Sequence, residues 1–204
     1  MQEAFRKRGI DRHAESIIMY SLICSSHRLE SLTAALDLIN DVEGDTAEIG
    51  CAGGGTSKLI ALLNGGRRHW ACDTFDGLKD TGEYDDLKDG EFSSKRCTAP
   101  IVSDRLAEQS NAVVVAGYFP DSAPEKMKSA TYAFAHLDVD TYKSMHAAFS
   151  FFDKRMSSGA VLALDDVLGS GTRGAKRAWQ EISAGTNRWR LVSENDPQIV
   201  IQCI

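Results

Sequence analysis

The stretch "DTAEIGCAGGGTSKLIALLNGGRRHWACD", residues 45–73, decides the fold class. An apolar run leads into a glycine loop, the loop opens a helix that Asn64, Gly65 and Gly66 would end, and a second apolar run follows. This order is typical of a βαβ unit. Because strands and helices alternate in the same way further along the chain, we predict an α/β fold with a doubly wound, mostly parallel sheet.

The remaining apolar runs extend this sheet to seven strands. They are "AVVVAG" (112–117), "YAFAHLD" (132–138), "AVLALDD" (160–166), "RWRLVSEN" (188–195) and "QIVIQCI" (198–204), with helices expected at 142–156 and 174–182. Only "DP" joins the last two runs, which is too short for a crossover connection. We therefore predict a C-terminal antiparallel hairpin at the end of the sheet.

Length and composition predict one domain. The chain has 204 residues, 43% of them hydrophobic, which is enough for one well-filled core. We expect this domain to span residues 1–204, with a helical region at 1–43. The long polar segment 77–100 is interpreted either as a lid or as a solvated surface insertion.

Charge and cysteine content exclude some classes of partner. A formal net charge of −6 argues against a nucleic-acid-binding surface, and no apolar run approaches the roughly 18 residues needed to span a membrane. The five cysteines are scattered without a C-x-x-C pair, which fits a reducing cytoplasm. We expect a cytoplasmic protein that binds neither nucleic acid nor membrane. The sequence leaves open whether the protein forms a homo-oligomer.

The glycine loop and the acids around it predict the cofactor. The loop lacks the G-x-G-x-x-G spacing that places a pyrophosphate on a helix, and the preceding Glu48 suits an ammonium group better than a phosphate. Asp73 ends the second strand, where a carboxylate can accept both hydroxyls of a ribose. S-adenosylmethionine has an amine and a ribose. The expected contacts are Glu48, Gly50, Gly54 and Asp73. Alternatively, the glycines only form a turn and Asp73 only caps the next segment.

Two other strands end in paired carboxylates. Asp138 and Asp140 follow one apolar run, and Asp165 and Asp166 follow the next. Four carboxylates at one poorly hydrated sheet edge repel one another, so a cation is expected among them. Hard oxygen ligands suit Mg²⁺. The alternative is that each aspartate only caps the helix that follows its strand.

One of these aspartates is the expected general base. A hydroxyl bound to Mg²⁺ loses its proton more easily, and Asp140 beside the metal can accept it; Lys143 and His146 are weaker alternatives. His136 lies within an apolar run, and we interpret it as a hydrogen-bonded core residue rather than a ligand.

The chain resembles the macrocin O-methyltransferase family in "AEIGCAGGGTS", "ACDTFDGL", "GYFPDS", "HLDVDTYKS" and "LALDDV", from about residue 28 to the C-terminus. The resemblance implies a Rossmann-like methyltransferase fold and metal-dependent methyl transfer from S-adenosylmethionine to a sugar hydroxyl of an antibiotic. It implies that Asp140 is the base. The implied magnesium ligands are Asp138, Asp165 and Asp166, and the implied cofactor contacts are Glu48, Gly50 and Asp73.

The predicted function is therefore Mg²⁺-dependent O-methylation of a small-molecule acceptor, namely a sugar of a glycosylated natural product. Two alternatives stay open. One is a haloacid-dehalogenase-type phosphohydrolase, because "LDVDTY" fits a D-x-D-x-T motif, although that motif should open its domain. The other is a nucleoside-binding module without catalysis, which the buried charge of four aspartates argues against.

Overall fold

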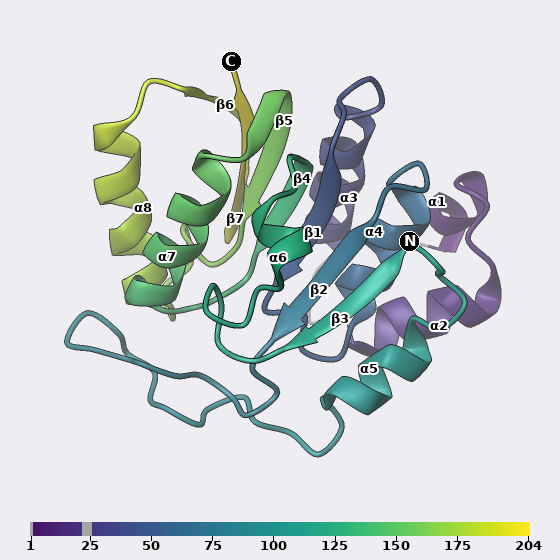
Figure 1. Cartoon of the computed structure of the whole chain (residues 1–204), viewed down its shortest axis with the longest axis horizontal. Coiled ribbons are helices and arrows are strands. Elements are labelled where there is room, and N and C mark those ends of the chain that lie inside the picture. Colours follow the sequence, from purple (N-terminus) through teal and green to yellow (C-terminus); the bar gives the residue numbers. More distant parts are fainter. Residues whose placement is uncertain (1, 22–25) are drawn as a thin grey trace.

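The computed structural model describes residues 2–21 and 26–204. The strands are β1 (Asp45–Ile49), β2 (His69–Asp73), β3 (Ala112–Ala116), β4 (Tyr132–Leu137), β5 (Met156–Leu164), β6 (Trp189–Asn195) and β7 (Gln198–Cys203). They form one sheet in the order β3-β2-β1-β4-β5-β7-β6 (Figure 1). β1 to β5 are parallel, and β7 is antiparallel to both β5 and β6. The predicted mostly parallel sheet with its terminal hairpin is confirmed.

Helices cover both faces of the sheet. They are α1 (Gln2–Lys7), α2 (Arg12–Ser21), α3 (Ser26–Asp37), α4 (Gly55–Leu63), α5 (Ala99–Arg105), α6 (Glu125–Lys128), α7 (Tyr142–Asp153) and α8 (Arg173–Gly185). α6, α7 and α8 pack on one face, and α3, α4 and α5 pack on the other (Figure 1). α1 and α2 pack outside α3 and α4. No helix among the described residues is long and apolar enough to cross a bilayer.

The central strand β4 is buried along its whole length, as expected of a parallel strand covered on both faces. On one face, Phe134 joins the apolar cluster formed with Leu32 and Leu36 of α3. On the other, Tyr132 makes an edge-to-face contact with Phe152 of α7, their ring centroids 4.9 Å apart. Burial of side chains this large contributes roughly 1.5–3 kcal/mol each, which holds the strand ends in register.

One helix is shorter than the sequence predicts. α7 ends at Asp153 rather than at Met156, and Met156 is the first residue of β5. The guanidinium of Arg155 donates a 2.8 Å hydrogen bond to the carbonyl of Phe151, which provides a partner for a carbonyl of the last turn. The following residues are then free to pair with β4.

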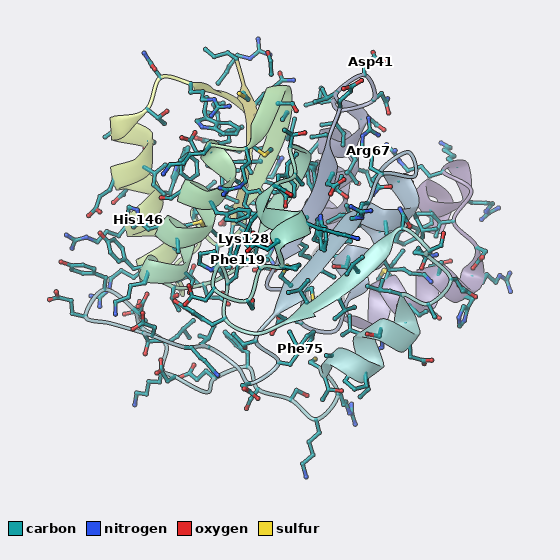
Figure 2. All side chains as sticks on the ribbon, viewed as in Figure 1. Asp41, Arg67, Phe75, Phe119, Lys128 and His146 are labelled. Atoms are coloured by element: carbon teal, nitrogen blue, oxygen red, sulfur yellow. The ribbon has the colours of Figure 1, made fainter. Side chains whose placement is uncertain are left out.

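The register of the parallel strands creates the site. Ile49, Leu137 and Leu164 are aligned across β1, β4 and β5, so the residues that follow these strands meet at one edge. Phe75, just beyond β2, lies at this carboxyl edge, whereas Arg67 lies at the opposite edge (Figure 2). Ligands of open α/β sheets bind beyond the carboxyl ends of the strands.

Candidate active site

A cavity of about 640 Å³ opens at the carboxyl edge of the sheet. Its walls come from the glycine loop, the end of β2, the turn after β4 and the segment 77–100. Apolar side chains of that segment, including Leu78, Leu87 and Phe92, face polar groups at the strand ends. A volume of this size is typical of sites that enclose a small organic ligand.

Two predicted glycines have different surroundings. Gly50 lines the cavity at a φ of 88°, and a Cβ atom there would overlap the carbonyl oxygen of Asp138. Gly50 is therefore required by the close approach of β1 and β4. Gly54, with a φ of 79°, precedes α4 and faces the side chain of Val102 instead of the cavity. α5 therefore lies against the side of Gly54 where a side chain would be, and Gly54 is not part of the cavity wall.

Asp73 lies on the cavity wall and organises the loop beside it. Its Oδ2 accepts a 2.8 Å hydrogen bond from the backbone N–H of Ala52, and its Oδ1 accepts a 2.7 Å bond from the N–H of Phe75. Each carboxylate oxygen can accept more than one hydrogen bond, so both remain able to bind a ribose hydroxyl. Asp73 is thus on the cavity wall at the end of β2, and its role toward a ribose stays a prediction.

Glu48 is placed differently from the prediction. Its side chain is only 1% exposed and does not line the cavity. One oxygen accepts a hydrogen bond from the Ser57 hydroxyl, and the other lies 2.9 Å from Nδ1 of His136. The cause is the register, because Glu48 and His136 are paired neighbours on β1 and β4. The carboxylate is therefore held by Ser57 and His136 and is not part of the cavity wall.

The four aspartates do meet at the sheet edge. Asp138, Asp140 and Asp166 each offer a carboxylate oxygen within 4.8 Å of the others. Asp140 and Asp166 have positive φ values of 58° and 61°, which is uncommon for a residue with a side chain. Such backbone geometry persists where the surroundings fix it, and it often marks a functional site.

Asp165 belongs to a second group, formed with Asp138 and His136. Its Oδ1 contacts Nη2 of Arg28 at 2.7 Å and accepts a 2.9 Å hydrogen bond from the N–H of Asp166. Its Oδ2 lies 3.4 Å from both Nε2 of His136 and Nε2 of Gln198. Nitrogen groups thus contact both oxygens of Asp165, and one of these oxygens also lies within 4.8 Å of a carboxylate oxygen of Asp138.

The pKa values of the site reflect this crowding. Burial and the charges of Asp165 and other carboxylates raise the pKa of Asp138 well above its usual range. Burial and a hydrogen bond with Asp166 raise the pKa of Asp140 to about 8. Burial alone would lower the pKa of His136, but its contacts with Asp165 and Glu48 raise it to about 10.

Asp165 behaves in the opposite way. Burial would raise its pKa, but the hydrogen bond from His136 and the charges of His136 and Arg28 hold it below the usual value. Asp165 is thus the carboxylate whose charge the protein itself stabilises, whereas Asp138 and Asp140 lack equivalent partners. A further cation near Asp138 and Asp140 would relieve their mutual repulsion.

The middle of the segment 77–100 is fastened to α7 and α8. Oδ1 of Asp85 accepts a 2.8 Å hydrogen bond from the N–H of Tyr142, the first residue of α7. The Tyr84 ring lies between the Tyr142 ring, at 4.7 Å, and the Arg177 guanidinium, at 3.7 Å. Arg173 of α8 donates to the carbonyl of Tyr84. Figure 1 shows this segment as the long connection between β2 and α5.

One residue of the site was not singled out from the sequence, and a second was not assigned to the site. Arg28 lines the cavity, but nothing in the sequence connects α3 with acids so far along the chain. His136 was expected to be a hydrogen-bonded core residue, and it is buried and hydrogen-bonded. Its position two residues before Asp138 was the available signal, because alternate strand residues lie on one face.

Comparison with known proteins identifies relatives of the chain. The family model described as Macrocin-O-methyltransferase (TylF) matches residues 1–188. Among curated proteins, no match was found.

Solved structures provide a second comparison. The O-methyltransferase NovP matches with a TM-score of 0.69 at 22% identity, over 87% of this chain and 79% of that one. CalS11, a calicheamicin methyltransferase, matches with a TM-score of 0.72 at 18% identity, over 95% and 92% of the two chains. An O-methyltransferase from Bacillus cereus in complex with SAH gives 0.64 at 17% identity, over 95% and 91%. These likenesses confirm the Rossmann-like methyltransferase fold.

Proposed function

Because the chain belongs to the macrocin O-methyltransferase family, we propose that it transfers a methyl group from S-adenosylmethionine to a sugar hydroxyl of a glycosylated small molecule, with Mg²⁺ at the aspartate cluster. The family establishes an S-adenosylmethionine-dependent O-methyltransferase. The sugar acceptor, the metal and the roles of individual residues are the proposed part. The arrangement of Asp73 and the aspartate cluster on one cavity wall is the observation that carries the proposal.

The cavity fits the proposed cofactor. Asp73 would bind the ribose hydroxyls, since it lies at the end of β2. The N–H groups of Ala52 and Phe75 hold its two oxygens in place through hydrogen bonds. Gly50 lines the cavity and would present its backbone to the methionine part, while the carbonyl of Asp138 fills the direction of its missing side chain. The N-terminus of α4 follows this loop and favours a carboxylate through its dipole. Glu48 would act indirectly by holding Ser57 and His136 beneath the loop.

The aspartate cluster fits a magnesium ion. Its donors are carboxylate oxygens, which Mg²⁺ prefers. Those of Asp138, Asp140 and Asp166 lie within 4.8 Å of one another, and an oxygen of Asp165 lies within 4.8 Å of one of Asp138. The raised pKa of Asp138 indicates a buried carboxylate without sufficient positive charge nearby. We assign the ligands as Asp138, Asp165 and Asp166. When bound, the ion would hold the acceptor oxygen and make its hydroxyl more acidic.

Asp140 is the proposed general base. It lies on the cavity wall, and burial together with a hydrogen bond with Asp166 raises its pKa to about 8. A proton acceptor is most effective when its pKa is near the working pH. Lys143 is a poorer candidate, because its ammonium group is 2.6 Å from Asp80 at the surface. His146 lies outside the cavity and pairs with Glu181 at 3.3 Å.

The acceptor would enter below the segment 77–100, which we propose acts as a lid. Leu87 and Phe92 of this segment form apolar wall, and the Phe92 side chain is the most exposed large apolar group near the cavity. Apolar wall beside a carboxylate cluster suits a molecule with hydroxyls on one part and an apolar body on the other. NovP and calicheamicin methyltransferase, two structural neighbours, are named for natural-product methylation or O-methylation.

The phosphohydrolase alternative loses support from the topology. A D-x-D-x-T nucleophile should follow the first strand of its domain, whereas Asp138 follows β4. The glycine loop occupies the position after β1 instead. The family match is also to a methyltransferase.

Calorimetric titration with S-adenosylmethionine, with and without Mg²⁺, tests the proposal together with a methyl-transfer assay. Glycosides with neighbouring sugar hydroxyls are the acceptors to screen. We expect cofactor binding with or without the metal, and methyl transfer that chelator abolishes and added Mg²⁺ restores. An active preparation that keeps full turnover in excess chelator would show that the aspartates are structural.

A further inference from the structure

Arg28 occupies part of the aspartate cluster. It lies in the first turns of α3, and its Nη2 is 2.7 Å from Oδ1 of Asp165 and 3.1 Å from Oδ1 of Asp166. The three side chains are 13%, 2% and 17% exposed, so little water separates them. One guanidinium nitrogen thus bridges two carboxylates that we assign to the metal.

The remaining contacts of Asp165 show why Arg28 matters for metal binding. Oδ2 faces His136 and Gln198 beneath the cavity, so this oxygen is held by buried groups. Oδ1 faces Arg28, which lines the cavity. A metal in the cavity that used Oδ1 of Asp165 would share this oxygen with the Arg28 guanidinium.

We propose that Arg28 is an internal counter-cation that occupies the metal site in the metal-free protein and is displaced when Mg²⁺ binds. This inference rests on the proposed function, because it requires the metal site. Two cations at the same carboxylate oxygens repel each other strongly where water is scarce. A divalent ion compensates the four carboxylates better than one guanidinium does, so the ion displaces the arginine at sufficient concentration.

The packing of α3 confines the change to a side chain. Leu29 and Leu32 follow Arg28 in α3 and are 3% and 1% exposed. Leu29 packs with α1, α2 and α4, and Leu32 packs against the sheet. Their burial holds the helix backbone in place while the flexible arginine side chain rotates within the cavity. Arg28 is therefore a positioning residue that keeps the carboxylates in place before the metal arrives.

Calorimetric titration of the metal-free protein with MgCl₂, in the absence of cofactor, tests this proposal. Arg28→Met removes the competing charge and keeps an unbranched side chain. We expect it to bind Mg²⁺ at least about tenfold more tightly than the wild type, the effect of one short-range buried charge. In chelator, the variant should unfold at a lower temperature than the wild type, and Mg²⁺ should raise its unfolding temperature by more.

Arg8→Met is the matched control. Arg8 forms a two-bond ion pair with Asp37 at the other end of α3, at 2.9 and 2.7 Å, and does not line the cavity. It should bind Mg²⁺ like the wild type. If Arg28→Met does not fold, Arg28→Lys serves instead, because a shorter cation holds Asp165 less well and should give a smaller gain in affinity.

The outcomes separate this inference from the proposed function. Equal or weaker Mg²⁺ affinity in the Arg28 variants, with clear binding by the wild type, overturns the displacement of Arg28 alone. Absence of Mg²⁺ binding in the wild type and in the Arg28 variants overturns the metal site and the inference together. A gain confined to the Arg28 variants supports both.

Discussion

Asp73 and Ala52 are joined by a 2.8 Å hydrogen bond from the backbone N–H of the glycine loop to the carboxylate at the end of β2. Ala52 has a φ of 43°, so the loop backbone is held in a conformation that residues other than glycine rarely adopt. Asp73 therefore both shapes the loop and presents oxygens to the cavity.

Replacing Asp73 by Ala should weaken S-adenosylmethionine binding by about 1–3 kcal/mol, the usual range when a hydrogen bond to a charged group is lost. Calorimetry measures the affinity directly. Asp76→Ala is the control, since the Asp76 side chain is 71% exposed and pairs with Lys79 at the surface. Unchanged affinity in the Asp73 variant would remove the ribose assignment.

Metal binding and proton transfer should separate in two aspartate variants. Asp140→Asn should lower turnover by roughly 10²–10⁴-fold, the range for loss of a general base, and leave Mg²⁺ affinity largely unchanged. Asp165→Asn should reduce both, because it removes a proposed ligand. Calorimetry with MgCl₂ and a methyl-transfer assay provide the two measurements. If Asp140→Asn binds Mg²⁺ like the wild type and also keeps full turnover, Asp140 is not the base.

The segment 77–100 should depend on its attachment to α8. Arg173 donates hydrogen bonds of 3.2 Å to the carbonyls of Glu83 and Tyr84, so Arg173→Ala should loosen the segment. Trypsin should then cleave after Lys88 and Arg96 faster than in the wild type. Cofactor plus acceptor should slow cleavage of the wild type if the segment is a lid.

The control for this experiment is Arg190→Ala, which removes a surface hydrogen bond to Gln202 on the distant terminal hairpin. Its cleavage pattern should match that of the wild type. Equal sensitivity of the wild type with and without both ligands would argue that the segment is a surface insertion.

A buried histidine away from the aspartates predicts sensitivity to acid. Burial and, to a smaller extent, the charge of His136 lower the pKa of His69 to about 3. Below about pH 6.5, His69 binds a proton in the unfolded chain but stays neutral in the folded protein. The free energy of unfolding therefore decreases as the pH falls from 6.5 toward 3.

His69→Asn should flatten this decline by up to about 1.4 kcal/mol per pH unit, which corresponds to one proton. Asn can replace Nδ1 in the 3.0 Å contact with Thr46. Denaturant unfolding at several pH values gives the slope, and His13→Asn on the exposed side of α2 is the control. An unchanged slope in His69→Asn would mean that this histidine titrates normally in the folded protein.

The fold could be predicted because each strand carries its own local signal. The run at β4 is apolar throughout and ends abruptly at Asp138, and the "DP" between the last two runs leaves room only for a hairpin. The same local signals place Asp73 and the aspartates at the carboxyl edge. The carboxyl ends of parallel strands lie at the same edge of the sheet, however the helices pack on it.

The directions of individual side chains could not be predicted in this way. β1 is buried on both faces, so alternation does not reveal that Glu48 faces His136 rather than the cavity. The contact of Arg28 with Asp165 depends on how α3 packs across the sheet, which has no local signature. Gly54 was similarly ambiguous, since a glycine required by Val102 looks the same in sequence as one required by a ligand.

The close approach of Gly50 to the carbonyl of Asp138 has an evolutionary consequence. Backbone contact between β1 and β4 fixes how far the loop beside the cofactor lies from the first aspartate of the cluster. That spacing cannot be retuned by exchanging side chains, and any larger residue at position 50 would disrupt it. Divergence toward new acceptors is therefore expected to accumulate at Leu87, Phe92, Ser94 and Cys97, which line the cavity and lie outside this backbone contact.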